Sequence, residues 1–209
     1  IRKSNMQTIA IVDYGMGNVR SVQKAIEHVA PNDKCFLTNN PQVIRDSDRV
    51  VFPGQGAMGS CMSALESNEL IDEVKLASKS KPFLGICLGL QLLFDYSEEN
   101  NTTQGLSIVP GKVLKFQNST LKIPHMGWNR VNQVKDHPLW HNIENNSRFY
   151  SVHSYYVEEG DKSCVAGTTN YGHTFTSAIS IDKLFAVQFH PEKSQSDGLQ
   201  LLKNFTDWK

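Results

Sequence analysis

The first half of the chain alternates short apolar runs with segments of helical periodicity, and this alternation limits the possible folds more than any other feature. Thr8–Asp13 is an apolar run that ends in a glycine-rich turn, and Asn18–Val29 then carries apolar residues at helical spacing. Strands that alternate with helices indicate a parallel sheet with right-handed crossovers. By the same criteria, further strands are expected at Lys34–Thr38, Arg49–Pro53 and Lys81–Cys87, and further helices at Leu65–Ala77 and from Leu88 to about Tyr96.

The second half of the chain changes to short β-type runs separated by turn residues such as Pro110-Gly111, and it closes with an amphipathic helix at Gly198–Phe205. We therefore predict a single α/β domain over residues 7–209, preceded by a possible N-terminal extension, residues 1–6. The domain should have three layers, with a mostly parallel central sheet, flanking helices and additional strands from the second half. Those strands are expected at Lys112–Phe116, Trp128–Val134, Arg148–Val157, Cys164–Thr169, Phe175–Ile181 and Leu184–Phe189.

Composition argues against several classes of protein. Lysine plus arginine equals aspartate plus glutamate, at 21 each, so no overall field favours nucleic acid or an anionic membrane. No apolar run approaches the ~20 residues of a membrane span, and the first residues lack the apolar core of a signal peptide. The four cysteines show no paired spacing, so neither disulfides nor zinc are expected. His137 and His141 stand four apart, but Pro138 between them favours a solvated loop over a metal site. We expect a cytoplasmic protein.

The strongest chemical signal is Gly85-Ile86-Cys87-Leu88-Gly89, which lies between an apolar strand and an apolar helix. A nucleophile on a sharp strand-to-helix turn needs small neighbours, because the turn is strained and the backbone packs closely. A helix N-terminus also favours a thiolate and offers backbone N–H groups to an oxyanion. The alternative is a buried structural cysteine, which we accept for Cys35, Cys61 and Cys164 but not for Cys87.

The segment Gln188-Phe189-His190-Pro191-Glu192 supplies a candidate base and its orienting group. An apolar strand ends at His190, and Glu192 lies two residues on, so an extended chain would direct both side chains to the same side. The carboxylate could then hold the imidazole while the other ring nitrogen faces the thiol. A surface loop would explain this segment alone equally well. Its combination with the cysteine turn makes it specific.

Two glycine-rich turns follow other strands. Pro53-Gly54-Gln55-Gly56 can orient a backbone N–H toward a developing oxyanion, although an ordinary strand-to-helix turn is an equal alternative. Asp13–Asn18 contains G-x-G after a strand, as in a dinucleotide site. The third glycine of that motif would fall at Arg20, whose side chain is too bulky for the close packing required. We reject a dinucleotide site.

Together these segments resemble the class I, or triad, glutamine amidotransferases. The motifs that carry the resemblance are G-I-C-L-G-L-Q, P-G-x-G and F-H-P-E-K-S. The further segments D-Y-G-M-G-N, P-H-M-G-W-N, V-H-S-Y-Y and G-L-x-L-L-K-N-F are similar to those of the glutaminase subunits of imidazole glycerol phosphate synthases. The likeness runs in order from Gln7 to the end. It implies a flavodoxin-like amidotransferase fold without a cofactor.

The resemblance also implies roles for individual residues. Cys87 would be the nucleophile, His190 the acid and base, and Glu192 its orienting partner. The Leu88 N–H and the peptide between Gly54 and Gln55 would form the oxyanion hole, after that peptide flips. The family more often has valine in place of Gln55. Glutamine would contact Gly56, Gln91, Glu99 and the backbone of Ser154 and Tyr155, while the partner and the ammonia exit would face Asn18, His125, Met126, Trp128, Tyr150 and Lys193.

By the same resemblance, the chain hydrolyses glutamine and passes ammonia to a (β/α)8 cyclase subunit, with which it forms a heterodimer. The partner would make imidazole glycerol phosphate and an aminoimidazole carboxamide ribotide for histidine biosynthesis. One alternative is a paralogous glutaminase that supplies ammonia to surface-sugar synthesis, to which Gln55 could point. A second alternative is a non-catalytic binding module on the same fold.

Overall fold

The computed structural model describes residues 6–117 and 121–209, and its centre is one mixed sheet of twelve strands. The expected extension at residues 1–6 lies outside the described residues apart from Met6. Part of the sheet is parallel, as the strand–helix alternation predicted. In spatial order, this part comprises β2 (Lys34–Thr38), β1 (Thr8–Val12), β3 (Arg49–Gly54), β4 (Phe83–Cys87) and β14 (Leu184–Val187).

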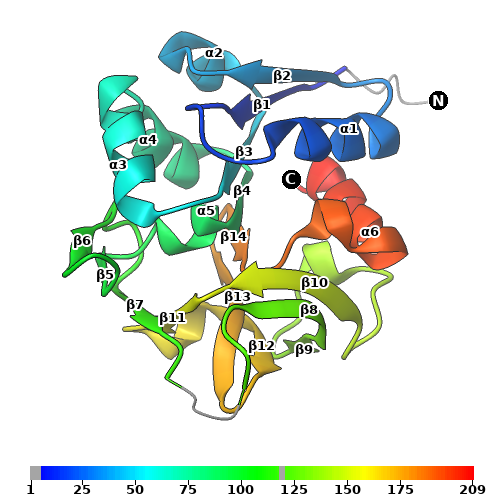
Figure 1. Cartoon of the computed structure of the whole chain (residues 1–209). Helices are drawn as coiled ribbons and strands as arrows, with labels where there is room; N and C mark the ends of the chain where they lie inside the picture. Colours follow the sequence, from blue (N-terminus) through cyan, green and yellow to red (C-terminus); the bar gives the residue numbers. More distant parts are fainter. Residues whose placement is uncertain (1–5, 118–120) are drawn as a thin grey trace.

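Helices cover both faces of the parallel part, which confirms the three-layer α/β prediction (Figure 1). Successive side chains of a strand point to opposite faces. Ile9 and Ile11 therefore join one core, with α1 (Val19–Val29) and α6 (Gln195–Asp207). Ala10 and Val12 join the other core, with the helices α2 (Pro41–Asp46), α3 (Met58–Ser67) and α4 (Ile71–Ser80).

The additional strands extend this sheet and form a second, smaller one, which lies below the parallel part in Figure 1. Their pairing is antiparallel except between β5 and β7. The strands that extend the large sheet are β5 (Tyr96–Ser97), β6 (Thr103–Gln104), β7 (Gly111–Lys115), β9 (Asn132–Gln133), β11 (Tyr155–Glu159), β12 (Val165–Asn170) and β13 (Thr174–Ile181). The small sheet pairs β8 (His125–Arg130) with β10 (Arg148–His153).

The decisive contact for function is the pairing of β14 with β4. The two strands run parallel, with Leu184 opposite Phe83 and Val187 opposite Ile86. The segments that follow them, far apart in sequence, therefore leave the same edge of the sheet side by side. Ligands of open α/β sheets bind at this carboxyl edge.

Four predicted elements differ from the structure. The strand predicted at Trp128–Val134 begins earlier, at His125, and is interrupted at Val131, because β8 pairs in the small sheet and β9 in the large one. The helix predicted at Leu65–Ala77 is wrong as a single helix, because Glu69 adopts a left-handed conformation (φ 56°) and separates α3 from α4. The helix predicted from Leu88 stops at Gln91 as α5, because the next carbonyls accept bonds from a returning loop, including one from the Leu106 N–H to the Leu92 oxygen (2.8 Å). The strand predicted at Arg148–Val157 is interrupted at Ser154.

In the described parts of the chain, no helix has the length and apolar character needed to cross a membrane. Short 3-10 turns complete the secondary structure. These are η1 (Pro138–Trp140), η2 (Lys162–Cys164) and η3 (Pro191–Lys193).

Candidate active site

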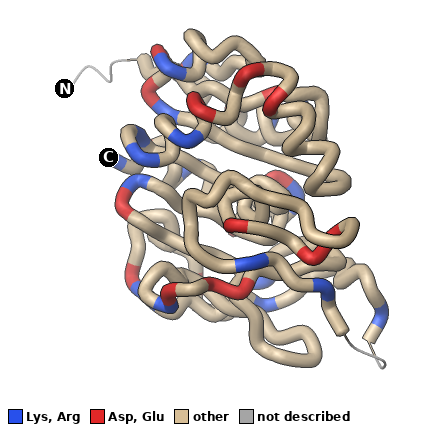
Figure 2. The backbone as a smooth tube through the Cα atoms, turned by 90° about the vertical axis from the view of Figure 1, so that its left-hand side faces the viewer, with Lys and Arg blue, Asp and Glu red and all other residues tan. Residues whose placement is uncertain are grey.

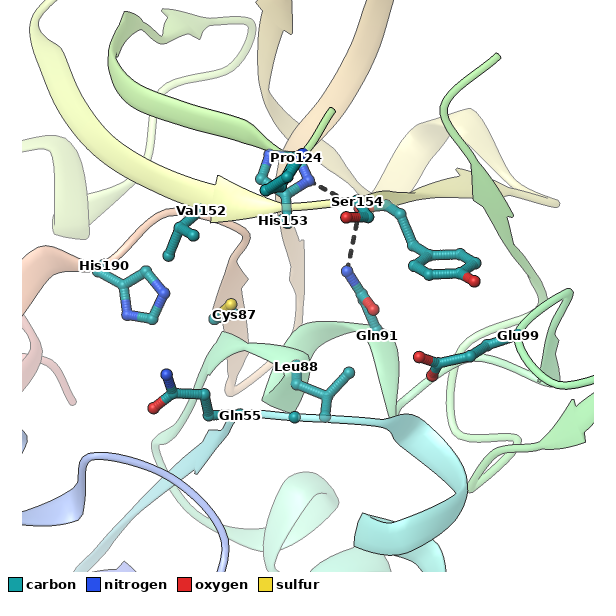
Figure 3. A pocket seen from close by; sticks show the side chains of 12 residues that line it. Gln55, Cys87, Leu88, Gln91, Glu99, Pro124, Val152, His153, Ser154 and His190 are labelled. Carbon is teal, nitrogen blue, oxygen red and sulfur yellow. Dashed lines mark hydrogen bonds between the residues drawn. The ribbon is translucent and has the colours of Figure 1, made fainter. Parts of the chain in front are cut away.

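Cys87 lies at the sharp turn between β4 and α5, as the flanking glycines predicted. Its backbone is left-handed (φ 55°, ψ −112°), a conformation that non-glycine residues seldom adopt. Such strained residues cluster at functional sites. The side chain is 7% exposed and faces a cleft at the carboxyl edge of the sheet (Figure 3).

The two glycines of this turn are required by close approach of neighbouring groups. A Cβ on Gly89 would lie 1.9 Å from the Phe52 carbonyl oxygen, and one on Gly85 would lie 2.9 Å from the Ala186 Cβ. The start of α5 therefore packs directly on β3. This contact holds the first backbone N–H groups of α5, which have no partner within the helix, beside Cys87.

His190 and Glu192 form the pair that their spacing predicted. His190 Nδ1 and Glu192 Oε1 are 2.8 Å apart, and both side chains are almost completely buried. The pair does not come from an extended strand, since Pro191 begins the turn η3. The His190 backbone N–H donates to the Tyr150 oxygen (2.8 Å), and the Ser194 hydroxyl donates to the His190 oxygen (2.6 Å). These bonds fix the position of the imidazole.

The charges around His190 favour its protonated form. Burial lowers the pKa of His190, but the facing Cys87 side chain and then the Glu192 carboxylate more than offset this effect and raise the pKa from 6.5 to about 10. Glu192 Oε2 is buried without a hydrogen-bond partner. Nε2 of His190 is also buried without one. Catalytic hydrogen bonds are often loose before substrate binds, so Nε2 remains available to a reacting group.

The glycine-rich turn after β3 lies beside Cys87, since Gly54 pairs with Cys87 across β3 and β4. The Tyr14 hydroxyl donates to the Pro53 oxygen (3.0 Å), and the Cys61 thiol donates to the Gln55 oxygen (3.6 Å). Gly56 has φ 97°, which favours glycine. The second turn, residues 13–18, packs against the first, because a Cβ on Gly17 would lie 3.6 Å from the Gln55 nitrogen.

The cleft extends from Cys87 and His190 to a polar end at Glu99 (Figure 3). Its volume is about 270 Å³, slightly below the ~300–1,000 Å³ of common ligand pockets, which suits a small metabolite. The Gln91 Nε2 group donates to the Tyr155 oxygen (3.1 Å). Glu99 Oε2 accepts from the Met58 N–H (2.6 Å) at the start of α3. The lining residues named from sequence are Gln55, Gly56, Cys87, Leu88, Gln91, Glu99, Ser154, Tyr155 and His190.

Sequence reasoning missed two polar residues of this site. Gln188 donates from Nε2 toward Cys87 Sγ (3.8 Å) and accepts from Gln91 Nε2 (3.0 Å). Its position two residues before His190 was a signal that could have found it, because alternate residues of a strand face the same side. His153 lines the cleft and bonds the Tyr155 oxygen through Nδ1 (2.7 Å). The sequence signal that could have identified His153 was its position next to Ser154, a predicted substrate-binding residue.

The other three cysteines and the two spaced histidines do not line the cleft. Burial raises the pKa of Cys35 to about 12, that of Cys164 to about 11 and that of Cys61 above its usual value, so all three favour the unreactive thiol. His137 does not lie in a solvated loop, because its ring packs on Phe185 (4.6 Å) and its Nδ1 accepts from the Leu139 N–H (3.1 Å). Among residues 6–117 and 121–209, no His, Cys, Asp and Glu side chains form a group of three or more that could hold a metal ion.

The residues expected to face a partner fall into two groups. Met126 is 57% exposed and Trp128 is 38% exposed, and the Trp128 ring contacts Tyr150 edge-on (6.2 Å). Lys193 Nζ lies 5.9 Å from the centre of the Tyr150 ring, and Asn18 is exposed on the first-half side of the cleft. His125, in contrast, is 3% exposed and points into the protein. Along the described part of the backbone, Lys and Arg positions are interspersed with Asp and Glu positions (Figure 2).

Comparison with known proteins agrees with this geometry. The family model described as glutamine amidotransferase class-I matches residues 10–208, almost the entire chain. The chain belongs to the class I glutamine amidotransferases. Solved structures at low identity share the amidotransferase fold: a putative GMP synthase subunit from Thermoplasma acidophilum has a TM-score of 0.71 at 17% identity, covering 97% of this chain and 94% of that one. The glutaminase domain of Trypanosoma brucei CTPS has a TM-score of 0.66 at 18% identity, covering 98% and 95%.

Other relatives are much more similar in sequence and share one name. The protein named imidazole glycerol phosphate synthase subunit HisH from Nitrosospira multiformis is 57% identical, over 98% of this chain and 99% of its own length. Proteins of the same name from Nitrosomonas europaea and Pseudomonas putida are 53% and 49% identical, over 97% of this chain and 99% and 98% of their lengths. By their names, these relatives are subunits of imidazole glycerol phosphate synthases.

Proposed function

We propose that this amidotransferase hydrolyses glutamine to glutamate and ammonia, as the glutaminase subunit of an imidazole glycerol phosphate synthase. The observation that carries the proposal is the cleft in which Cys87, on a strained turn, faces a buried His190 backed by Glu192 at 2.8 Å. A thiol, an imidazole and a carboxylate in this order form a nucleophile, a proton carrier and an orienting group. The relatives at 49–57% identity favour the histidine-pathway subunit over the surface-sugar alternative.

The proposed reaction begins with attack of the Cys87 thiolate on the carboxamide carbon of glutamine. Backbone N–H groups of Leu88 and of the Gly54–Gln55 peptide stabilise the tetrahedral oxyanion. The His190 imidazolium gives its proton to the leaving nitrogen, which departs as ammonia and leaves a glutamyl thioester. Water then attacks the thioester while His190 accepts its proton. This step releases glutamate and restores the thiolate.

The amino-acid end of glutamine would occupy the polar end of the cleft, beside Gly56, Glu99 and the Ser154–Tyr155 backbone. Gln91 uses its Nε2 group for the Tyr155 oxygen and Gln188. Its Oε1 atom therefore faces the cleft next to the Glu99 carboxylate (Figure 3). These oxygens are acceptors suited to the substrate ammonium group.

The released ammonia would pass to a (β/α)8 cyclase subunit in a heterodimer. We propose that the partner covers the patch of Met126, Trp128, Tyr150 and Lys193. Exposed Met and Trp side chains fit a protein interface, where aromatic residues dominate the binding energy. The patch is continuous with the catalytic pair, because the Tyr150 oxygen accepts the His190 N–H. Asn18 remains part of the same proposed interface. The buried His125 cannot touch a partner directly and is proposed only to line the ammonia exit behind the patch.

The test is the Cys87→Ala variant assembled with the synthase subunit. Glutamine-dependent product formation should fall by at least about 10³-fold, since the nucleophile is removed. Turnover with free ammonium should remain, because the partner needs ammonia and not the thiol. The measurements are glutamate release and synthase product, with Cys35→Ala as the matched control. Glutamate release by Cys87→Ala at the wild-type rate would refute the proposed nucleophile.

A further inference from the structure

The substrate pocket is backed by an uninterrupted chain of side-chain hydrogen bonds that begins on the small sheet. Asn129 Nδ2 lies 3.2 Å from His125 Nε2, and His125 Nδ1 lies 2.9 Å from His153 Nε2. His153 Nδ1 lies 2.7 Å from the Tyr155 oxygen. That oxygen also accepts from Gln91, the residue whose amide faces the cleft. The chain therefore connects strand β8 to the glutamine pocket.

The donors and acceptors at the two ends determine the proton positions on both rings. A side-chain amide nitrogen can only donate, so His125 Nε2 must accept from Asn129. The orientation of that amide is fixed, because its oxygen accepts from the Arg130 N–H (2.8 Å) and its nitrogen also donates to the Asn170 oxygen (2.9 Å). At the other end a carbonyl can only accept, so His153 Nδ1 must donate to Tyr155. Both ends give the same result, with each ring neutral and protonated on Nδ1.

Burial keeps the two rings in this neutral state. His125 is 3% exposed and His153 is 6% exposed. Burial lowers the pKa of His125 to about 4. It lowers the pKa of His153 to about 3, although the bond to the Tyr155 oxygen acts in the opposite direction. A second proton on either ring would remove an acceptor and break the chain, so the arrangement persists at neutral pH.

The histidine pair lies at the junction of the two sheets. His153 and His125 are register partners at the end of the small sheet, and Tyr155 is the first residue of β11 in the large sheet. Ser154 lies between β10 and β11, and its own oxygen accepts from the Phe116 N–H (3.1 Å). The bond from His153 to Tyr155 therefore holds the backbone at the point where the chain passes from one sheet to the other, inside the pocket.

We infer that His125 and His153 form a tautomer-locked relay that positions the Tyr155 carbonyl and the Gln91 amide for glutamine binding. This inference rests on the proposed glutaminase function. The two histidines act as positioning residues through the backbone and Gln91. Without the relay the Tyr155 oxygen would turn more freely, and Gln91 would lose a fixed acceptor. Glutamine binding should then weaken more than the chemical step slows.

Two substitutions of His125 separate positioning from packing. His125→Asn keeps a donor near the place of Nδ1, whereas His125→Leu removes it. The KM for glutamine should rise about 5- to 10-fold in His125→Leu, the effect of about one neutral hydrogen bond, while kcat changes less. His125→Asn should restore most of the affinity. His173→Leu is the matched control, because this exposed histidine contacts the same Phe116 ring (5.6 Å) but lies outside the relay.

The ring protons provide a test that needs no substitution. Nitrogen-15 NMR of the labelled wild-type chain should show His125 and His153 neutral and protonated on Nδ1 at pH 7. A proton on Nε2 of either ring would overturn the relay, whatever the variants do. An unchanged KM in a folded His125→Leu protein, with an active wild-type enzyme, would also overturn it. An inactive wild-type enzyme would instead contradict the proposed function.

Discussion

At the residue scale, His190 and Glu192 have different roles in catalysis. His190 carries the proton and faces Cys87, whereas Glu192 touches His190 through one oxygen and remains behind it. Because the carboxylate acts only through the imidazole, its removal leaves the proton carrier in place. The His190 backbone N–H also donates to the Tyr150 oxygen, and the Ser194 hydroxyl donates to the His190 oxygen, so the backbone of His190 is held independently of Glu192.

We therefore expect Glu192→Gln to retain more activity than His190→Ala. By analogy with other nucleophilic triads, the difference in kcat for glutamate release should be about 10- to 100-fold. The matched control is Glu158→Gln, which removes an exposed carboxylate paired with Lys112 (3.0 Å) and should leave kcat unchanged. Equal residual rates in Glu192→Gln and His190→Ala would show that another group orients the imidazole.

At the element scale, the site depends on how closely α5 approaches β3. The short helix begins directly at Leu88, so any shift of α5 moves the Cys87 turn and the adjacent N–H groups. A Cβ at Gly89 would lie 1.9 Å from a backbone oxygen, and no side-chain rotation can relieve that contact. The backbone itself must move.

Gly89→Ala should consequently lower both stability and activity. Overpacking of this kind is expected to lower Tm by more than about 5 °C and to reduce glutamate release strongly. Gly59→Ala is the matched control within α3, since its Cβ would have only ordinary contacts, the nearest at 3.7 Å to Thr103. Alanine is about 0.5–1 kcal/mol better than glycine in a helix, so this control should be at least as stable as the wild type. Calorimetry and the glutaminase assay give the two readouts.

At the scale of the whole molecule, three buried or half-buried histidines make stability depend on pH. Burial lowers the pKa of His125 to about 4, that of His137 to about 4 and that of His153 to about 3. The unfolded chain has the ordinary value of 6.5, so between pH 6.5 and 4 it binds more protons at these sites than the folded chain. Stability rises with pH wherever the unfolded state binds more protons.

We expect the free energy of unfolding to fall as the pH drops from 6.5 to 4, measured by urea titration at each pH. His137→Asn tests one contribution, because asparagine keeps an acceptor for the turn at Pro138–Trp140 but cannot take up a proton. The slope of stability against pH should decrease by up to about one proton in this variant. An unchanged slope would mean that His137 is already protonated in the folded protein.

Much of the fold was predictable because its signals are local. The apolar runs became β1 to β4, and the small residues around Cys87 correctly marked a turn too tight for side chains. The break at Glu69 was not predicted, because the helical pattern of apolar residues continues across it. The early end of α5 was not predicted for another reason. The hydrogen bonds that stop the helix come from residues beyond Gly105, which are distant in sequence.

The sequence by itself determined the alternation of elements, the nucleophile turn and the spacing of His190 from Glu192, since each depends on residues adjacent in the chain. Only the tertiary structure decided that β14 lies beside β4 and so places His190 opposite Cys87. It also decided the inward direction of His125, its bond to His153 and the contact of Gln188 with Cys87. The physical reason is that these contacts join residues far apart in sequence, and strand pairing and burial, not local propensity, select them.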